Sequence, residues 1–230
     1  MNRIMLAALA FTAASPAAAA ERRYSITDFD RVQVDGPYQV TLVSGGPTGA
    51  VAAGTAQALD AVSVEVQGRT LRIRANRSAW GGYPGARAGG VTIKVAARDI
   101  VSAAISGSGT LGIDRVKGLR LDLSVSGSGS LSVAAVDADT LSVGLLGSGK
   151  ISLAGRAKQL RATISGTGDL AAAGLRADDL NLNADTAGGI AVGAVRSAKV
   201  RATGQGDVEI IGTPACTIQG ASSGQVKCGR

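Results

Sequence analysis

Aliphatic and polar residues alternate along most of the chain after position 101, in short runs separated by glycine or charged residues. Clear examples are Leu121-x-Leu123-x-Val125, then Leu131-x-Val133, and then Leu141-x-Val143-x-Leu145. Strict alternation places every second side chain on the same side of a β-strand. The pattern therefore predicts many short strands, each with one aliphatic side and one side of serine, threonine, asparagine and charged residues that faces water.

Pairs of glycines separate these strands at intervals of 19 or 20 residues. The first glycines of the pairs are Gly107, Gly127, Gly147, Gly166 and Gly204, and one irregular repeat falls near Gly188-Gly189. Such a period is typical of a solenoid, in which each coil lays its strands beside those of the next coil. Glycine adopts positive φ angles without steric cost, so we expect each pair to form a corner. Six coils spaced by about 4.8 Å would make a rod about 30 Å long.

The opposite corner of each coil is predicted to be polar and charged, at residues 137–139, 156–158, 176–179 and 196–199. A polysaccharide-cleaving β-helix, the enzyme class to weigh here, would need clustered carboxylates on one exterior face. The acids at this corner are Asp137, Asp139, Asp178 and Asp179. Lys158 and Lys199 occupy neighbouring coils, however, and the chain has no histidine. We therefore predict a solvated column of ion pairs between coils and no catalytic residues.

The N-terminal half is less regular. Residues 24–100 are predicted to form short strands and hairpins, ahead of repeat coils at 101–230. One hairpin is expected at 24–43 with its turn at Asp35-Gly36-Pro37, and another at 62–73 with its turn at Gly68. No linker divides the two halves, so residues 21–230 are expected to be one folded unit.

The first 20 residues have the pattern of a signal peptide. Arg3 precedes an apolar run from 4 to 14, and an A-x-A site ends at Ala20. The apolar run is too short for a stable anchor, and no second stretch approaches membrane-spanning length. The pattern predicts export to the periplasm, the cell surface or the medium, with no integral membrane segment.

Two cysteines, Cys216 and Cys228, are predicted to form a disulfide, because an even count in an exported protein favours pairing. Cys216 occupies the repeat position of Leu121, and Cys228 that of Val133, so both are expected to point inward in the last coil. A catalytic or metal-binding thiol is the alternative, and it is disfavoured because no histidine is present.

The formal net charge is +7, and it falls by one if Arg3 leaves with the signal peptide. A basic balance can favour anionic partners, but the cations are scattered, without a lysine or arginine run or a ladder of aromatics. The composition therefore argues against nucleic-acid binding.

No metal or cofactor site is predicted. A phosphate-binding glycine loop requires a helix after the glycines, whereas strands follow here. Asp169 and Asp207 follow two of the glycine pairs, but calcium-binding β-roll repeats have a nine-residue period with an aspartate in each turn. The equivalent positions in this chain hold Thr110, Ser130 and Lys150.

The irregular stretch 76–90 is the best candidate for ligand binding. It contains Trp80, Tyr83, Arg77 and Arg87 among glycines. Exposed aromatic rings stack on sugars, and tryptophan, tyrosine and arginine are frequent interface anchors. The alternative is that Trp80 and Tyr83 fold back as a lid on the solenoid.

The order of these motifs resembles the head GIN domain family, described as putative autotransporter adhesins. The matching residues are Phe29-x-x-Val32-x-Val34-x-Gly36, Val40-x-Leu42, Leu59-x-x-Val62-x-Val64-x-Val66-x-Gly68, Leu71-x-Ile73, the strand at Val91 and the repeats at Ser106 and Ser126. The resemblance implies a right-handed parallel β-helix in an exported protein associated with the cell envelope. It supplies no catalytic residues to carry over, and no large C-terminal β-barrel of the autotransporter type is expected within these 230 residues.

Together these features predict an all-β solenoid that acts as a non-enzymatic, adhesin-like binding or structural module of the cell envelope, with an envelope glycan or surface protein as partner. Two alternatives stay open. One is a carbohydrate-active enzyme on the same scaffold, and the other is an envelope protein that self-associates through the unpaired strand edges of its end coil.

Overall fold

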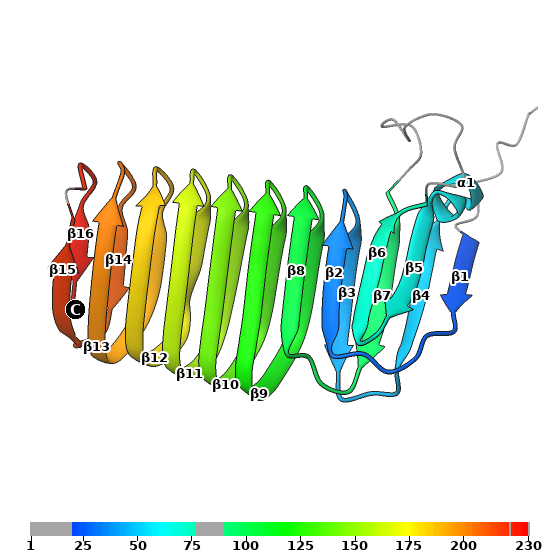
Figure 1. The fold of residues 1–230 in the computed structure, drawn as a ribbon, viewed down its shortest axis with the longest axis horizontal. Helices are drawn as coiled ribbons and strands as arrows, with labels where there is room; N and C mark the ends of the chain where they lie inside the picture. The colour runs from blue at the N-terminus through cyan, green and yellow to red at the C-terminus, as the bar shows by residue number, and fades with distance from the viewer. Residues whose placement is uncertain (1–19, 77–89, 221, 230) are drawn as a thin grey trace, which may run out of the picture.

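The computed structural model describes residues 20–76, 90–220 and 222–229. It is a β-solenoid of about six turns with additional short strands at its N-terminal end (Figure 1). The short elements that precede the repeats are β1 (Ala20–Tyr24), β2 (Arg31–Asp35), β3 (Gln39–Ser44), β4 (Gly49–Gly54), α1 (Ala56–Asp60), β5 (Val62–Gln67), β6 (Thr70–Ala75), β7 (Thr92–Ala97) and β8 (Ser102–Gly107). Those of the repeats are β9 (Thr110–Gly127), β10 (Ser130–Gly147), β11 (Lys150–Gly166), β12 (Asp169–Thr186), β13 (Ile190–Thr203), β14 (Val208–Ile211), β15 (Ala215–Gln219) and β16 (Val226–Cys228).

The coils build two sheets that face each other. The first sheet runs in the order β1-β4-β7-β3, then the N-terminal parts of β9 to β13, then β14 and β16. The second sheet runs β5-β6-β2-β8, then the C-terminal parts of β9 to β13, then β15. Strands β9 to β13 are long because each bends through the charged corner and so belongs to both sheets (Figure 1).

Equivalent residues of successive coils stack in columns inside the solenoid, as the alternation predicts. Leu121, Leu141, Leu160 and Leu180 form one such column in the second sheet, and all four are almost fully buried. Burying each of these side chains contributes about 1.5–3 kcal/mol to stability. A narrow core of leucine, valine, isoleucine and alanine therefore holds the two sheets together.

The two glycines of each pair do different work at the corner. Gly127 and Gly147 have φ angles of +112°, which a side chain would strain. A Cβ at Gly147 would also lie 2.6 Å from the carbonyl oxygen of Gly127. At Gly149 space is the main constraint: a Cβ there would lie 2.5 Å from the carbonyl oxygen of Gly129 and 2.8 Å from Val125 Cγ1. Both glycines thus let one coil lie directly on the preceding one, and the first also turns the chain with a positive φ.

The irregular repeat uses a threonine in place of the first glycine. Thr186 pairs with Gly166 across the ladder and is buried, with 3% of its surface exposed. Its Oγ1 accepts a hydrogen bond from the Gly188 amide at 2.9 Å and lies 3.4 Å from the Gly168 carbonyl oxygen. A side-chain hydrogen bond at this coil therefore accompanies the turn that positive-φ glycines make elsewhere.

The N-terminal strands correct one sequence prediction and confirm another. The hairpin at 62–73 is confirmed, because β5 and β6 are antiparallel and Gly68 has a φ of +63°. The hairpin expected at 24–43 is wrong: β2 pairs in parallel with β6 and β8, and β3 with β7 and β9. Gly36, with a φ of +119°, makes a solenoid corner, and its amide donates to the Ser106 carbonyl oxygen.

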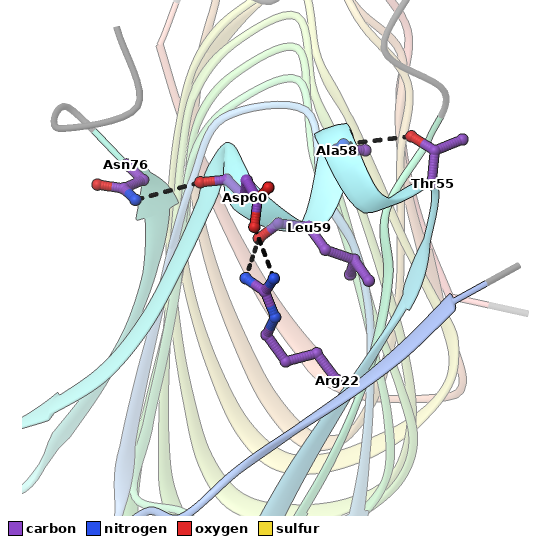
Figure 2. Close-up of polar contacts among 6 residues, drawn as sticks. All are labelled: Arg22, Thr55, Ala58, Leu59, Asp60 and Asn76. Atoms are coloured by element: carbon purple, nitrogen blue, oxygen red, sulfur yellow. Dashed lines mark hydrogen bonds and ion pairs between the residues drawn. The ribbon is translucent and has the colours of Figure 1, made fainter.

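A short cap covers the N-terminal end of the solenoid. Helix α1 buries Ala58 and Leu59, and the Thr55 hydroxyl accepts from the Ala58 amide at its start. Figure 2 shows Arg22 of β1 reaching the other end of the helix, where it donates to the Leu59 carbonyl oxygen at 2.9 Å and to Asp60 Oδ1 at 2.6 Å. Asn76 donates to the Asp60 carbonyl oxygen at 3.1 Å. The helix is thus held from two sides.

Within residues 90–220 and 222–229, no helix or strand covers the C-terminal end in this way. All five residues of β15 are exposed, although its inward side chains continue columns that are buried in the previous coils. Cys216 and Cys228 are joined in a disulfide that links β15 to β16, at the positions predicted from the repeat. The described residues contain no helix of sufficient length and apolarity to span a membrane.

Candidate functional site

The residues that the sequence singled out for ligand binding lie outside the described part of the chain. Trp80, Tyr83, Arg77 and Arg87 all fall between residues 77 and 89. Their role, as a binding loop or as a lid, stays a prediction. Within the described residues, the candidate binding surfaces are therefore the outer surfaces of the two sheets and the charged corner.

The charged corner is a column of ion pairs between neighbouring coils, as predicted. Arg156 of β11 donates to both oxygens of Asp137 on β10, at 2.8 and 3.0 Å. Lys158 lies 2.8 Å from Asp139, and Arg196 of β13 engages both oxygens of Asp179 on β12. Each pair joins a coil to its neighbour.

Two of these contacts favour the ionised form of a corner carboxylate, those of Asp137 and Asp179. The hydrogen bond from the Arg156 guanidinium lowers the pKa of Asp137. Hydrogen bonds from Arg196 and from the Ser197 hydroxyl lower the pKa of Asp179 from 3.8 to about 2. A carboxylate that is ionised and held by a cation suits coil-to-coil cohesion better than proton donation, which requires a raised pKa.

The outer surface of the second sheet is flat and is formed mainly by polar side chains. One row across the coils is Ser102, Asp122, Ser142, Arg161, Asn181, Lys199 and Thr217. The row beside it is Ala104, Ser124, Gly144, Thr163, Asn183, Arg201 and Gln219. Hydroxyl, amide and guanidinium groups thus recur at the strand spacing of about 4.8 Å, which is an arrangement suited to repeated hydrogen bonds with an extended ligand.

The outer surface of the first sheet is different, because its side chains are small. Gly112, Ser132, Ser152 and Ala171 stand in register on β9 to β12. Together with Thr41, Val43, Ala134, Ala154 and Gly174 they line a shallow, mainly apolar groove of about 490 Å³. Val43, at one end of the groove, is 52% exposed. The groove runs along the rod axis across five neighbouring strands.

A smaller cleft of about 190 Å³ lies near the start of β2. It is lined by Asp28, Phe29, Asp30, Arg69, Arg98 and Asp99. Arg69 donates to Asp30 Oδ2 at 2.6 and 3.0 Å, so two of the charged residues of the cleft form an ion pair. Nowhere among the described residues do three or more potential ligands gather in a way that would hold a metal ion.

Sequence reasoning missed the grouping of cations on the second sheet. In the sequence Arg161 lies far from Lys199 and Arg201, so the three do not form a run of basic residues. The register brings them together: Asn181 pairs with both Arg161 and Lys199, and Asn183 pairs with Arg201. An alignment of the outward-facing positions of successive 19- to 20-residue repeats would have revealed this grouping from the sequence.

Comparison with known proteins gives the same fold. Residues 28–214 match the family described as "Putative auto-transporter adhesin, head GIN domain". The chain is similar to a crystal structure of a putative adhesin from Bacteroides fragilis, with 20% identity, a TM-score of 0.82, and coverage of 91% of this chain and 96% of that one. No match was found among curated proteins.

Two further crystal structures are similar over the same extent. One is described as a putative lipid binding protein from Parabacteroides distasonis, with 21% identity, a TM-score of 0.73, and coverage of 91% and 96% of the two chains. The other is a putative adhesin from Parabacteroides merdae, with 18% identity, a TM-score of 0.69, and coverage of 91% and 95%. At these identities the likeness shows the fold alone.

Proposed function

Since the chain belongs to the head GIN domain family of putative auto-transporter adhesins, we propose that it is a non-enzymatic, adhesin-like binding module of the cell envelope. The observation that carries the proposal is the flat polar surface of the second sheet, where outward hydroxyl, amide and cationic groups stand in register over seven strands, β8 to β13 and β15. Such a surface offers many weak contacts to an extended ligand and no enclosed cavity for a small one.

The charged corner supports binding rather than catalysis. Three of the four corner acids, Asp137, Asp139 and Asp179, each contact a cation of the adjacent coil, and the fourth, Asp178, is exposed to solvent. The proposed setting is the exterior of the cytoplasmic membrane. It rests on the signal-peptide pattern of residues 1–20, the disulfide and the adhesin-like family.

A glycan array and a panel of envelope polymers would test the proposal. We compare the mature protein with Ser124→Trp, which places a bulky side chain in the middle of the polar surface, and with Ser132→Trp, the matched change on the first sheet. For any glycan or polymer that the mature protein binds, we expect the Ser124 variant to lose affinity at least tenfold. The Ser132 variant should keep the affinity of the mature protein. Absence of binding to every array and panel member would contradict a binding role.

The same screen includes a Trp80→Ala, Tyr83→Ala variant. If the 76–90 stretch contributes contacts, this variant loses affinity although the polar surface is intact. If the two aromatic residues form a lid, the variant keeps its affinity and loses thermal stability instead. The binding surface is then the second sheet alone.

The groove on the first sheet supports a second candidate function, the binding of an acyl chain. Its lining is mainly apolar, and one protein of the same fold is described as a putative lipid binding protein. Fluorescent fatty-acid displacement would test this, with Ser152→Phe to fill the groove and Thr163→Phe as a control on the opposite sheet. Equal displacement of the fluorescent fatty acid in the two variants would exclude the groove as the acyl-chain binding site.

A further inference from the structure

Three cations lie together on β11 and β13 of the second sheet, and they differ from the cations of the corner. At the corner, Arg156, Lys158 and Arg196 each contact an acid of the neighbouring coil. In contrast, Arg161, Lys199 and Arg201 are exposed, and none forms a hydrogen bond or ion pair within the described residues. We call Arg161, Lys199 and Arg201 the cation patch.

Amide and hydroxyl side chains surround the cation patch. Asn181 lies between Arg161 and Lys199 in the ladder, and Asn183 and Gln219 flank Arg201. Two acids are near. Asp179 is engaged by Arg196 and Ser197, and Asp185 lies exposed towards the glycine corner of β12. The patch therefore keeps an excess of positive charge together with neutral hydrogen-bonding groups.

The spacing of the cation patch selects the shape of its ligand. Arg161 and Lys199 stand two strands apart in one row, about 10 Å, and Lys199 and Arg201 stand two residues apart on one strand, about 7 Å. In an extended β-1,4-linked uronan, carboxylates on one side of the chain recur every second sugar, which is close to two strand spacings. Guanidinium groups bind carboxylates in bidentate geometry, and the amides suit the ring hydroxyls.

From this arrangement we propose that the cation patch is a binding site for a linear polyanionic polysaccharide, with the sugar chain running along the solenoid axis across β11, β12, β13 and β15. The inference rests on the proposed binding function and specifies its ligand class. Carboxylates of the polymer bind Arg161, Lys199 and Arg201, and Asn181, Asn183 and Gln219 bind hydroxyls between them. No described aromatic side chain lies in these two rows, so charge rather than ring stacking selects the ligand.

Calorimetric titration of the mature protein with mannuronate-rich alginate tests the proposal. The matched ligand is the propylene glycol ester of alginate, which keeps the backbone and removes most of the charge. The patch variant is Arg161→Gln, Lys199→Gln, Arg201→Gln. The control variant, Lys94→Gln, Lys150→Gln, Lys227→Gln, removes three exposed cations elsewhere: Lys94 and Lys150 lie on the first sheet, and Lys227 lies on β16.

We expect alginate binding that weakens as salt rises, since salt screens exposed charges. The patch variant should lose affinity at least tenfold and the control variant less than threefold, with both variants keeping the parent's Tm to within a few degrees. The esterified polymer should bind at least tenfold more weakly than alginate.

Three outcomes would overturn the assignment. Equal binding of alginate and its ester would show that the ligand is neutral sugar, and equal losses in the two variants would show a response to net charge alone. Patch-dependent binding to phosphatidylglycerol vesicles without binding to alginate would identify a membrane surface instead. In each of these cases the protein still binds a ligand, so the proposed binding function remains supported. Failure to bind any polymer, array glycan or vesicle would contradict both proposals.

Discussion

Each coil turns twice, and the two corners are held by different physics. At the glycine corner, backbone lies directly on backbone, because Gly129 and Gly149 leave no room for a side chain against the preceding coil. At the charged corner, long side chains such as Arg156 and Asp137 reach between coils through solvent-exposed ion pairs. The same task, joining one coil to the next, is thus performed once by close contact and once by charge.

The difference predicts which corner the fold depends on. Overlap of buried atoms costs a protein several kcal/mol, whereas an exposed ion pair contributes about 0–1 kcal/mol. We therefore expect the glycine corner to determine whether coils stack and the charged corner to tolerate substitution. Four changes, in order of falling effect, test this expectation.

The largest effect is expected for Gly149→Ala. Its Cβ would meet the Gly129 carbonyl oxygen at 2.5 Å, so neighbouring coils must separate, and we expect a loss of about 3 kcal/mol or more in unfolding free energy. Gly144→Ala in the same strand is the control, because its Cβ would have only Ser124 Cβ at 3.9 Å. Urea denaturation of both variants would measure this difference in unfolding free energy. Equal midpoints would contradict the role of close packing at this corner.

The last coil should depend on its disulfide, since no further coil in the structure lies against either of its corners. Cys216→Ser, Cys228→Ser reopens a loop whose closure stabilises the folded state by about 2–3 kcal/mol. We expect amide hydrogens of β15 and β16 to exchange faster, with β9 to β11 unchanged. Hydrogen-exchange mass spectrometry provides the measurement. Uniform acceleration along the rod would show that the bond acts on the whole solenoid.

The threonine of the irregular glycine corner should have an intermediate effect. Thr186→Val keeps the shape of the side chain but removes the acceptor for the Gly188 amide, which costs about 1–2 kcal/mol when the donor is left unpaired. Thr163→Val, on the exposed surface of the second sheet, is the matched control and should change little. Thermal unfolding of the pair measures the difference. A Thr186 variant as stable as the control would mean that water replaces the hydroxyl.

The smallest effect is expected at the charged corner, and it depends on pH. The folded-state pKa of Asp179, about 2, lies below the ordinary value of 3.8. Its contribution to stability is therefore present above pH 4 and is lost as the pH falls from about 4 to about 2. Asp179→Asn removes this contribution, so its Tm should lie at most a few degrees below that of the parent at pH 5 and approach it at pH 2.

Asp122→Asn, which changes an exposed acid without a partner among the described residues, should show no such convergence. If the Asp179 variant lost as much stability as Gly149→Ala, the comparison between the corners would fail. The ion pairs would then determine the stacking of the coils.

The repeat region could be predicted from sequence in some detail. Alternation gave the inward columns, the glycine period gave the coils, and the repeat positions of Cys216 and Cys228 gave the disulfide. These predictions hold because identical physical demands recur in every coil, so that each repeat is evidence for the others.

The N-terminal strands could not be placed in the same way. The alternation at Val32 and Val34, and at Val40 and Leu42, is the same for a hairpin as for a solenoid coil, because both bury one side of each strand. Only the neighbours distinguish the two, and they come from distant parts of the sequence. The cation patch was missed for a related reason, because its members meet only through the register of β11, β12 and β13.

The position of the coil made by β2 and β3 has a consequence for how the chain acquires its structure. Both neighbours of this coil, β6 with β7 and β8 with β9, are synthesised after it. The segment 31–44 therefore has no partner strand until β6 and β7 have been made, and both of its sides are covered only after β8 and β9 follow. By contrast, β10 to β13 can each add to a finished coil as they emerge. Folding of this rod is thus expected to be delayed at its beginning and sequential towards its end.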